Sequence, residues 1–382
     1  MPLVAKGGHY CDVFLLSPDP SIGVPAPPPR LLLPGEVSRF GEQPLSEWRC
    51  FLCGRHLSKT TATREHVFPK WLQRRHNMGE SGVVLLNDSR MKYRQLTVPC
   101  CLACNGGALS ALERRVRDGF TAGADAVAEL DPYDVFLWLA KLSYGLLYRE
   151  LLLPNHRSAP RVGTIVGREH LETYRIQHAL LQGTFRRVLP HAFPATITLF
   201  KTQVHEKPGL NFDYRDNYFG PFVALRSNDV GIVAILQDWG LSRGMGWPQF
   251  DRAEAAQPLT TMQFNEVVAS GMYYATLLNR PVGVRHWEEG GATHLHPHLP
   301  DPPVARTELF EPFDMAEYAR LLAGVLHLQP ERVLRDDMVL TTLTTPNGTP
   351  VFTPFRTRLS SVAAAKAAAP EADQGRVEGG AE

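Results

Sequence analysis

Cysteine is scarce in this sequence and confined to one stretch. Of the six cysteines in 382 residues, five fall between positions 50 and 104, and Cys11 is the sixth. Disulfide-rich secreted scaffolds spread their cysteines along the chain, so this pattern excludes that class. It favours a reducing compartment and metal binding as the use of the thiols. We interpret Cys11 as a buried thiol.

Long apolar runs and net charge are also missing. No segment approaches the roughly 18 consecutive apolar residues of a membrane-spanning helix, so we expect none. Residues 1–16 lack the apolar core and cleavage site of a signal peptide, which predicts a cytoplasmic protein. The net charge of +1 excludes a polycation, so any contact with nucleic acid must come from a local basic patch.

The rest of the composition is that of an ordinary globular chain, long enough for about two domains. Proline-rich residues 1–44 predict an extended arm, and residues 45–120 hold the cysteine motifs. Residues 121–358 predict a mixed domain of helices and an antiparallel sheet. Residues 359–382 are rich in Ala, Glu and Gly, which predicts a disordered tail. The expected fold class is therefore α+β.

Apolar spacing predicts the main elements of this domain. A helical pattern starts near Asn105 and continues through 108–116. Three further helices are expected at 133–152, 262–279 and 314–327, and β-branched runs predict strands at 195–200, 222–225 and 230–236.

Two cysteine pairs carry the strongest chemical signal. Cys50 and Cys53 form one CxxC motif, and Cys101 and Cys104 form the second. Two such pairs supply the four thiolates of a closed tetrahedral zinc site. Cys100 adjoins Cys101 and is an alternative ligand, but Cys101 preserves the CxxC spacing.

Between the pairs lies Glu65-His66-Val67-Phe68-Pro69, and Asn105 directly follows the last cysteine. A zinc knot would bring His66 and Asn105 together from distant segments. A histidine beside a carboxylate, facing a second oxygen ligand, is the arrangement that metal-assisted phosphodiester hydrolysis needs.

In these motifs the chain resembles the HNH endonucleases, which carry a ββα-metal finger, and in particular the branch braced by a structural zinc. The resemblance covers about a fifth of the chain. It implies an endonuclease that cuts DNA, or alternatively RNA. The matching residues are Cys50, Cys53, Glu65, His66, Pro69, Cys101, Cys104 and Asn105.

The resemblance also implies a role for each residue. His66, near the end of a hairpin strand, would be the general base. Glu65 and Asn105 would hold one Mg²⁺ or Mn²⁺ ion, because hard oxygen ligands suit these cations. The middle asparagine of the signature has two candidates, Asn77 and Asn87, and part of 72–98 is expected to be an insertion loop.

A local basic excess accompanies the motif. Residues 45–120 hold thirteen Lys and Arg against six Asp and Glu. Such residues would contact a phosphate backbone without reading sequence, although a solvated face explains them equally well. The expected contacts are Lys70, Arg74, Arg75, Arg90, Lys92, Arg94, Arg114, Arg115 and Arg117.

His294, His296 and His298 are interpreted as an exposed, proline-rich loop, because Pro297 interrupts regular structure. The main alternative to the nuclease is a non-catalytic zinc module that binds nucleic acid or a partner protein. Composition does not predict the oligomeric state.

Overall fold

The computed structural model describes residues 45–156, 158–159, 161–168, 170–217, 221–245, 247–278, 282–298 and 310–354. The predicted arm, Cys11 and the predicted tail lie outside these residues. Helices and antiparallel sheets alternate along the described chain, which confirms the α+β class. Within the described residues, no helix combines the length and apolarity needed to cross a membrane.

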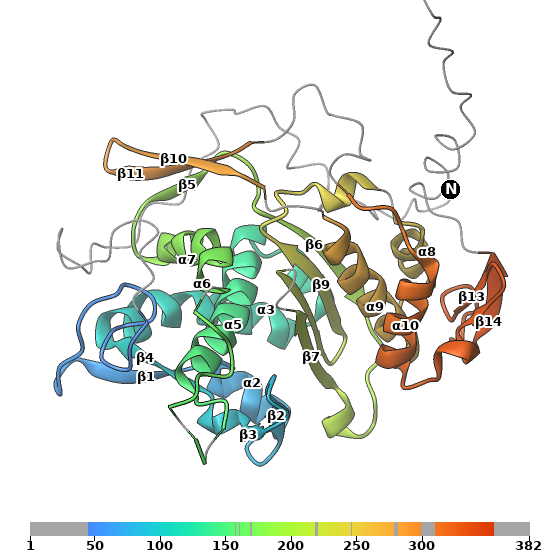
Figure 1. Ribbon diagram of the computed structural model, residues 1–382, viewed down its shortest axis with the longest axis horizontal. Helices are drawn as coiled ribbons and strands as arrows, with labels where there is room; N and C mark the ends of the chain where they lie inside the picture. Colours follow the sequence, from blue (N-terminus) through green and yellow to red (C-terminus); the bar gives the residue numbers. More distant parts are fainter. Residues whose placement is uncertain are drawn as a thin grey trace, which may run out of the picture.

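A four-stranded antiparallel sheet lies at the centre, in the order β6-β9-β8-β7 (Figure 1). All residues of β8 and β9 are buried, so both faces of the sheet are covered. The sequence predicted three of these strands correctly from their β-branched residues. The bounds are β6 (Ala195–Lys201), β7 (Phe212–Asn217), β8 (Phe222–Ser227) and β9 (Val230–Leu236).

Three helices pack on one face of this sheet, with α10 beyond α9. Gly271 of α9 lies so close to β9 that a Cβ atom there would come within 2.6 Å of Val233 Cγ1. A larger residue at this position would therefore push the helix away from the sheet. The helices are α8 (Pro248–Ala256), α9 (Thr261–Leu277) and α10 (Met315–Leu326), and the last two confirm the predicted ones.

The other face packs against the elements that carry the cysteine motifs. The apolar helix α5 contributes most of its residues to this core, in agreement with its predicted burial. Residues on both sides of position 120 pack together here, and the division into domains stays a prediction. The helices are α3 (Ser110–Ala122), α4 (Ala124–Ala128), α5 (Pro132–Leu152), α6 (His170–Thr173) and α7 (Arg175–Leu181).

A two-stranded antiparallel sheet precedes these helices. Strand β1 (Ala62–His66) pairs with β4 (Thr97–Cys101), so that His66 lies opposite Thr97 and Ala62 opposite Cys101. A π-helical turn, η3 (Cys104–Leu109), then leads directly into α3. Residues 67–96 leave and rejoin this pair, and they contain α2 (Lys70–Arg75), β2 (Gly82–Val84), β3 (Arg90–Lys92) and η2 (Tyr93–Gln95).

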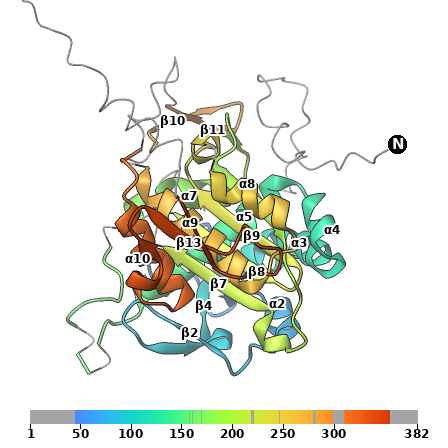
Figure 2. The same ribbon diagram turned by 90° about the vertical axis from the view of Figure 1, so that its right-hand side faces the viewer.

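Two small sheets lie at the periphery, and Figure 2 shows the β10–β11 hairpin at the top of the molecule. One has the order β10-β11-β5 and the other β12-β13-β14. Their strands are β5 (Val188–Pro190), β10 (Val284–Glu289), β11 (Ala292–Pro297), β12 (Leu334–Arg335), β13 (Met338–Thr341) and β14 (Val351–Pro354).

Candidate functional site

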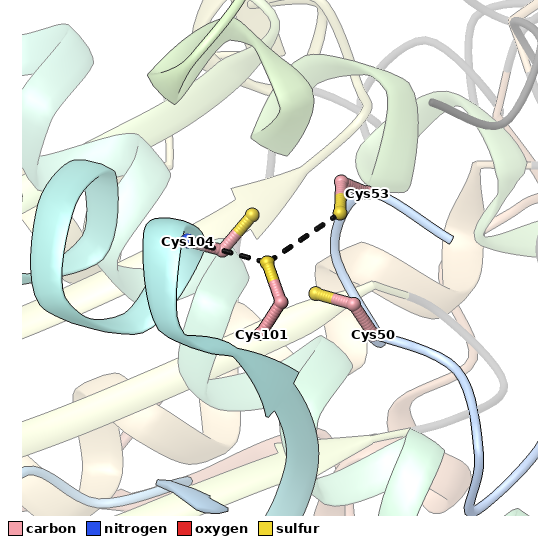
Figure 3. Close-up of side chains that lie close together, drawn as sticks. All are labelled: Cys50, Cys53, Cys101 and Cys104. Carbon is pink, nitrogen blue, oxygen red and sulfur yellow. Dashed lines mark hydrogen bonds between the residues drawn. The ribbon is translucent and has the colours of Figure 1, made fainter. Parts of the chain in front are cut away.

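The four cysteines of the two CxxC pairs converge at one end of the β1–β4 pair, where β1 begins and β4 ends (Figure 3). Cys50 and Cys53 lie on a turn before β1, while Cys101 ends β4 and Cys104 begins the π-helical turn. All four are buried, and their sulfur atoms lie within 4.8 Å of one another. The cluster could therefore hold a metal ion such as zinc.

Backbone contacts fix the positions of these sulfurs. The Phe51 amide donates to the Pro99 carbonyl at 2.9 Å, which joins the first turn to β4. Gly54 closes that turn with a φ of 73°, a conformation that glycine adopts without strain. The Cys104 amide donates to Cys101 Sγ at 3.4 Å, a contact that stabilises a thiolate.

The proton balance of the cluster fits a cation. Hydrogen bonding from Cys104 lowers the pKa of Cys101 to about 7, whereas hydrogen bonds to neighbouring thiols raise the pKa of Cys104. Four buried thiols cannot all ionise beside one another without a compensating positive charge. Zinc supplies that charge and prefers sulfur ligands in a closed, buried tetrahedron, so these residues fit it.

The structure also separates Cys100 from Cys101. Strand alternation turns the two side chains to opposite faces of β4. Cys101 belongs to the four-sulfur group, and Cys100 does not. Cys100 is nevertheless close, with its sulfur 3.8 Å from Cys50 Sγ, so it is a buried thiol at the edge of the cluster.

The same alternation sends Glu65 and His66 to opposite sides of β1. Glu65 is 6% exposed and faces the protein interior, whereas His66 is half-buried at the end of the strand. Glu65 and His66, which were predicted to act together, therefore lie on opposite faces of β1 and have different surroundings.

Lys141 of α5 binds the inner face of this strand. Its side chain is 1% exposed, and its Nζ lies 2.6 Å from Glu65 Oε1 and 2.8 Å from Glu113 Oε1. It also donates to the main-chain carbonyls of His66 at 2.5 Å and Val67 at 3.1 Å. One ammonium thus lies between two carboxylates and holds the end of β1.

His66 is suited to remain neutral. Burial lowers its pKa, and the nearby charges of Lys70 and Lys141 lower it further, while Glu113 opposes them. A neutral imidazole can accept a proton at physiological pH. The strand end therefore presents a base with a lysine nearby.

Asn105 joins the start of the helix to β1. Its Nδ2 donates to Thr63 Oγ1 at 3.0 Å and to the Arg64 carbonyl at 3.2 Å. The amide is thereby oriented by the strand that ends at His66. Asn105 lies in the π-helical turn, an irregularity that occurs frequently at functional sites.

A ligand set for a second cation is not assembled in the same way. Among the described residues, the four cysteines are the one group of three or more His, Cys, Asp or Glu side chains with ligand atoms within 4.8 Å. Glu65, Glu113 and His66 therefore do not form such a group. Asn105 approaches β1 two residues before Glu65, whose carboxylate is paired with Lys141.

Comparisons with known proteins add no name to this geometry. A scan of family models and searches of curated proteins and of solved structures found no match to this chain.

The predicted basic residues divide into two groups. Lys70, Arg74, Arg90 and Arg114 are exposed. The other five form polar contacts with neighbouring side chains, although Arg94, Arg115 and Arg117 are exposed as well. Arg115 forms a bidentate pair with Asp134, Arg117 binds Asp118, Lys92 and Arg94 bind Glu80, and Arg75 faces the Asn228 amide.

The two candidates for the middle asparagine also differ. Asn87 orders the β2–β3 turn, where its Oδ1 accepts from the Ser89 amide and hydroxyl and its Nδ2 donates to the Asn155 carbonyl. Asn77 is exposed with a φ of 49° just after α2. Asn87 thus braces the insertion, and the signature role stays a prediction for both.

Sequence reasoning missed Lys141. Its signal was available, because it is the one lysine in an otherwise apolar stretch of α5. A buried lysine requires acidic or carbonyl partners, which predicts an internal ion pair. The partners could not be assigned, because Glu65 and Glu113 lie far from it in the sequence.

The interpretation of 294–298 as a loop was wrong in part. Residues up to Pro297 form β11, because the hairpin partner β10 and the parallel strand β5 supply its hydrogen bonds. Pro297 interrupts the pattern only at the last residue of the strand, where a missing amide is tolerated. His294 and His296 therefore share one face of a strand.

Proposed function

We propose that this protein is an endonuclease of the HNH type, with β1, β4 and the helix after Asn105 as its ββα unit. The observation that carries the proposal is the contact of the Asn105 amide with Thr63 and Arg64. It links the helix that follows the cysteine cluster to the strand that ends at His66. Two distant parts of the motif are thereby adjacent.

His66 is the proposed general base. Its lowered pKa keeps the imidazole neutral near pH 7, so that it can take a proton from a water molecule attacking phosphorus. Lys141 holds the main-chain carbonyl of His66 from the inner face. The position of His66 at the strand end and its neutral imidazole thus both support the role of general base.

The exposed basic residues around this unit are proposed to contact nucleic acid, with DNA as the expected substrate. Lys70 lies close enough to His66 to influence its pKa, which makes it the first candidate for a phosphate contact. Arg74 and Arg114 are exposed on α2 and α3. Contacts of this kind position a backbone and are sensitive to salt.

The proposed catalytic Mg²⁺ or Mn²⁺ fits this arrangement only in part. Asn105 keeps its side-chain oxygen available while its nitrogen is anchored. Glu65 does not fit, because Lys141 holds its buried carboxylate at 2.6 Å. The proposal includes dependence on a divalent cation, which a comparison of activity with and without EDTA measures.

The test is nicking of supercoiled plasmid by the zinc-loaded protein with Mg²⁺ or Mn²⁺, compared with EDTA. We expect His66→Ala to lower the rate by at least about 100-fold, the usual contribution of a general base. His56→Ala is the matched control, because His56 is exposed in the same cysteine-rich region. Zinc content and circular dichroism should be equal in all three proteins.

A non-catalytic zinc module is the second candidate, and the Glu65–Lys141 pair favours it. A protein of this kind would bind plasmid or oligonucleotides without cutting them. Lys70→Ala with Arg114→Ala would then weaken binding, while His66→Ala would leave it unchanged. Intact plasmid, single strands and RNA after incubation with wild type would decide for the module.

A further inference from the structure

The outer face of the peripheral sheet gathers three imidazoles. His294 and His296 lie two residues apart on β11, so their side chains share one face. β11 pairs with β5 in parallel, and the His191 amide just after β5 donates to the Leu295 carbonyl at 2.8 Å. This contact places His191 beside His296 on the neighbouring strand.

The opposite face of the same sheet is buried along β11. Thr293 and Leu295 of β11 point inward and are 2% and 0% exposed. His191 and His296 are exposed, and His294 is half-buried. The histidines therefore lie on a sheet that is anchored from below and open to solvent above.

The nitrogen atoms are already spaced like metal ligands. His191 Nε2 lies 3.1 Å from His294 Nδ1. Zinc–nitrogen bonds of about 2.0–2.1 Å place neighbouring ligands about 2.9 Å apart in an octahedron and about 3.4 Å apart in a tetrahedron. The observed separation falls between these two values, so one cation could bind both rings with small adjustments.

His296 supplies the third ring. Its centroid lies 5.6 Å from that of His191, and the three rings do not yet form a group with all ligand atoms within 4.8 Å. His296 is exposed, so its side chain can change rotamer without displacing core residues. A turn of this one ring toward the other two would complete the set.

Neighbouring groups hold His294 in place. Trp287, its cross-strand partner on β10, stacks on it with centroids 5.0 Å apart and an interplanar angle of 8°. The guanidinium of Arg285 lies over the Trp287 ring, 5.5 Å from its centroid. Stacking thus supports His294, His191 contacts it, and the exposed side chain of His296 can turn toward both.

We propose that His191, His294 and His296 form a binding site for a divalent transition-metal ion such as Ni²⁺, Cu²⁺, Co²⁺ or Zn²⁺. Neutral imidazoles suit these ions and do not suit Mg²⁺ or Ca²⁺, which require oxygen ligands. Three protein ligands on an exposed face leave further coordination positions to water. The site is separate from the cysteine cluster and independent of nuclease activity.

The test is calorimetric titration of untagged, zinc-loaded full-length protein with Ni²⁺. One equivalent is expected to bind per chain while the zinc content stays constant. His191→Ala and His294→Ala should each weaken binding at least 10-fold, and His296→Ala should weaken it by a smaller factor. His286→Ala is the matched control, because it lies on the opposite face of the same hairpin.

A second readout uses the stacked tryptophan. Cu²⁺ quenches nearby indole fluorescence, so one of the six tryptophans should lose its emission at one equivalent of Cu²⁺. This loss should disappear in Trp287→Phe and in His294→Ala. Binding of Ni²⁺ that is equally strong in all variants, or weakened equally by His286→Ala, would show adventitious binding only and overturn the proposal. No binding beyond the structural zinc would overturn it as well.

Discussion

The cysteine cluster and the histidine cluster gather metal ligands in two different ways. Four sulfurs converge from loops and strand ends inside the core, whereas three imidazoles lie on the open face of a sheet. The sheet around the histidines has its own hydrogen bonds and apolar side. The cysteine cluster also has backbone support, but its four buried thiols cannot ionise together without a cation. A buried cluster is therefore expected to need its ion for folding, and an exposed cluster is not.

Removal of zinc should have the largest effect and test this contrast directly. Cys104→Ser should lose the ion and, with it, on the order of 10 kcal/mol of binding free energy that supports folding. This value is comparable to the whole stability of a typical protein, and the cysteines share one core with α5 and the central sheet, so the variant should be largely unfolded. The measurement is zinc content by mass spectrometry together with urea denaturation.

Cys100→Ala is the matched control for this experiment. Cys100 is as buried as the ligands and its sulfur lies 3.8 Å from Cys50 Sγ, yet it is outside the four-sulfur group. This variant should keep a full equivalent of zinc and lose only about 1–2 kcal/mol from the small cavity. Equal zinc loss in both variants would contradict the assignment of Cys101. Removal of Ni²⁺ from the histidine cluster should cost only the stabilisation that ligand binding adds and leave the protein folded, because the sheet has its own hydrogen bonds.

Loss of the Lys141 ammonium should destabilise the protein less than loss of zinc does. Lys141→Met removes a buried ammonium and leaves Glu65 and Glu113 without a positive partner. Loss of one member of a buried ion pair costs about 3–5 kcal/mol. The loss should appear as a lower urea midpoint while the zinc content stays at one equivalent.

Rescue distinguishes charge from packing in this variant. Lys141→Met combined with Glu65→Gln and Glu113→Gln has no buried charge left in the cluster, so it should recover most of the lost stability. If the triple variant is less stable than Lys141→Met, packing of the lysine stem determines the cost. The same comparison with Lys141→Arg tests whether a larger cation fits the site.

The smallest of the three effects concerns a histidine inside the fold. His76 is 4% exposed, its Nε2 lies 2.7 Å from Ser227 Oγ, and burial lowers its pKa to about 4. The unfolded chain binds a proton near pH 6.5, so folding is favoured above that pH and loses up to about 3 kcal/mol as pH falls toward 4. His76→Gln should flatten this loss, measured as the difference in unfolding free energy between the two proteins from pH 7.5 to 5.

His56→Gln, which replaces an exposed histidine, is the control for the substitution itself. This variant should keep the wild-type unfolding free energy at pH 7.5. A difference curve for His76→Gln that is flat across the whole range would show that Ser227 and the surrounding core accept the charged ring. Burial of His76 would then make no contribution to the pH dependence of stability.

The sequence was informative where a single residue type carried the signal. CxxC spacing predicted the four-sulfur group, including Cys101 over Cys100, because metal ligands must face one point. Apolar spacing predicted α5, α9 and α10 and three strands of the central sheet. Each CxxC pair and each apolar repeat is a local pattern, whereas the meeting of the two cysteine pairs follows from the four ligands that zinc requires.

Long-range pairing set the limit of sequence reasoning. Lys141 meets Glu65 and Glu113 from a different element, and no local spacing indicates such a meeting. His191 and His294 are 103 positions apart, and only the pairing of β5 with β11 brings them into contact. The mistaken loop at 294–298 has the same origin, because β10 and β5 stabilise β11.

The central sheet has a consequence for the order in which this molecule opens. Strands β8 and β9 are covered on both faces, and α9 approaches β9 closely at Gly271. The amide protons of β8 and β9 can exchange with deuterium only when the layers on both faces of the sheet separate, which amounts to unfolding of the whole molecule. The hairpin of β10 and β11, covered on one side, should exchange much earlier. Exchange would thus proceed from the periphery inward, and β9 would be the last strand to become labelled.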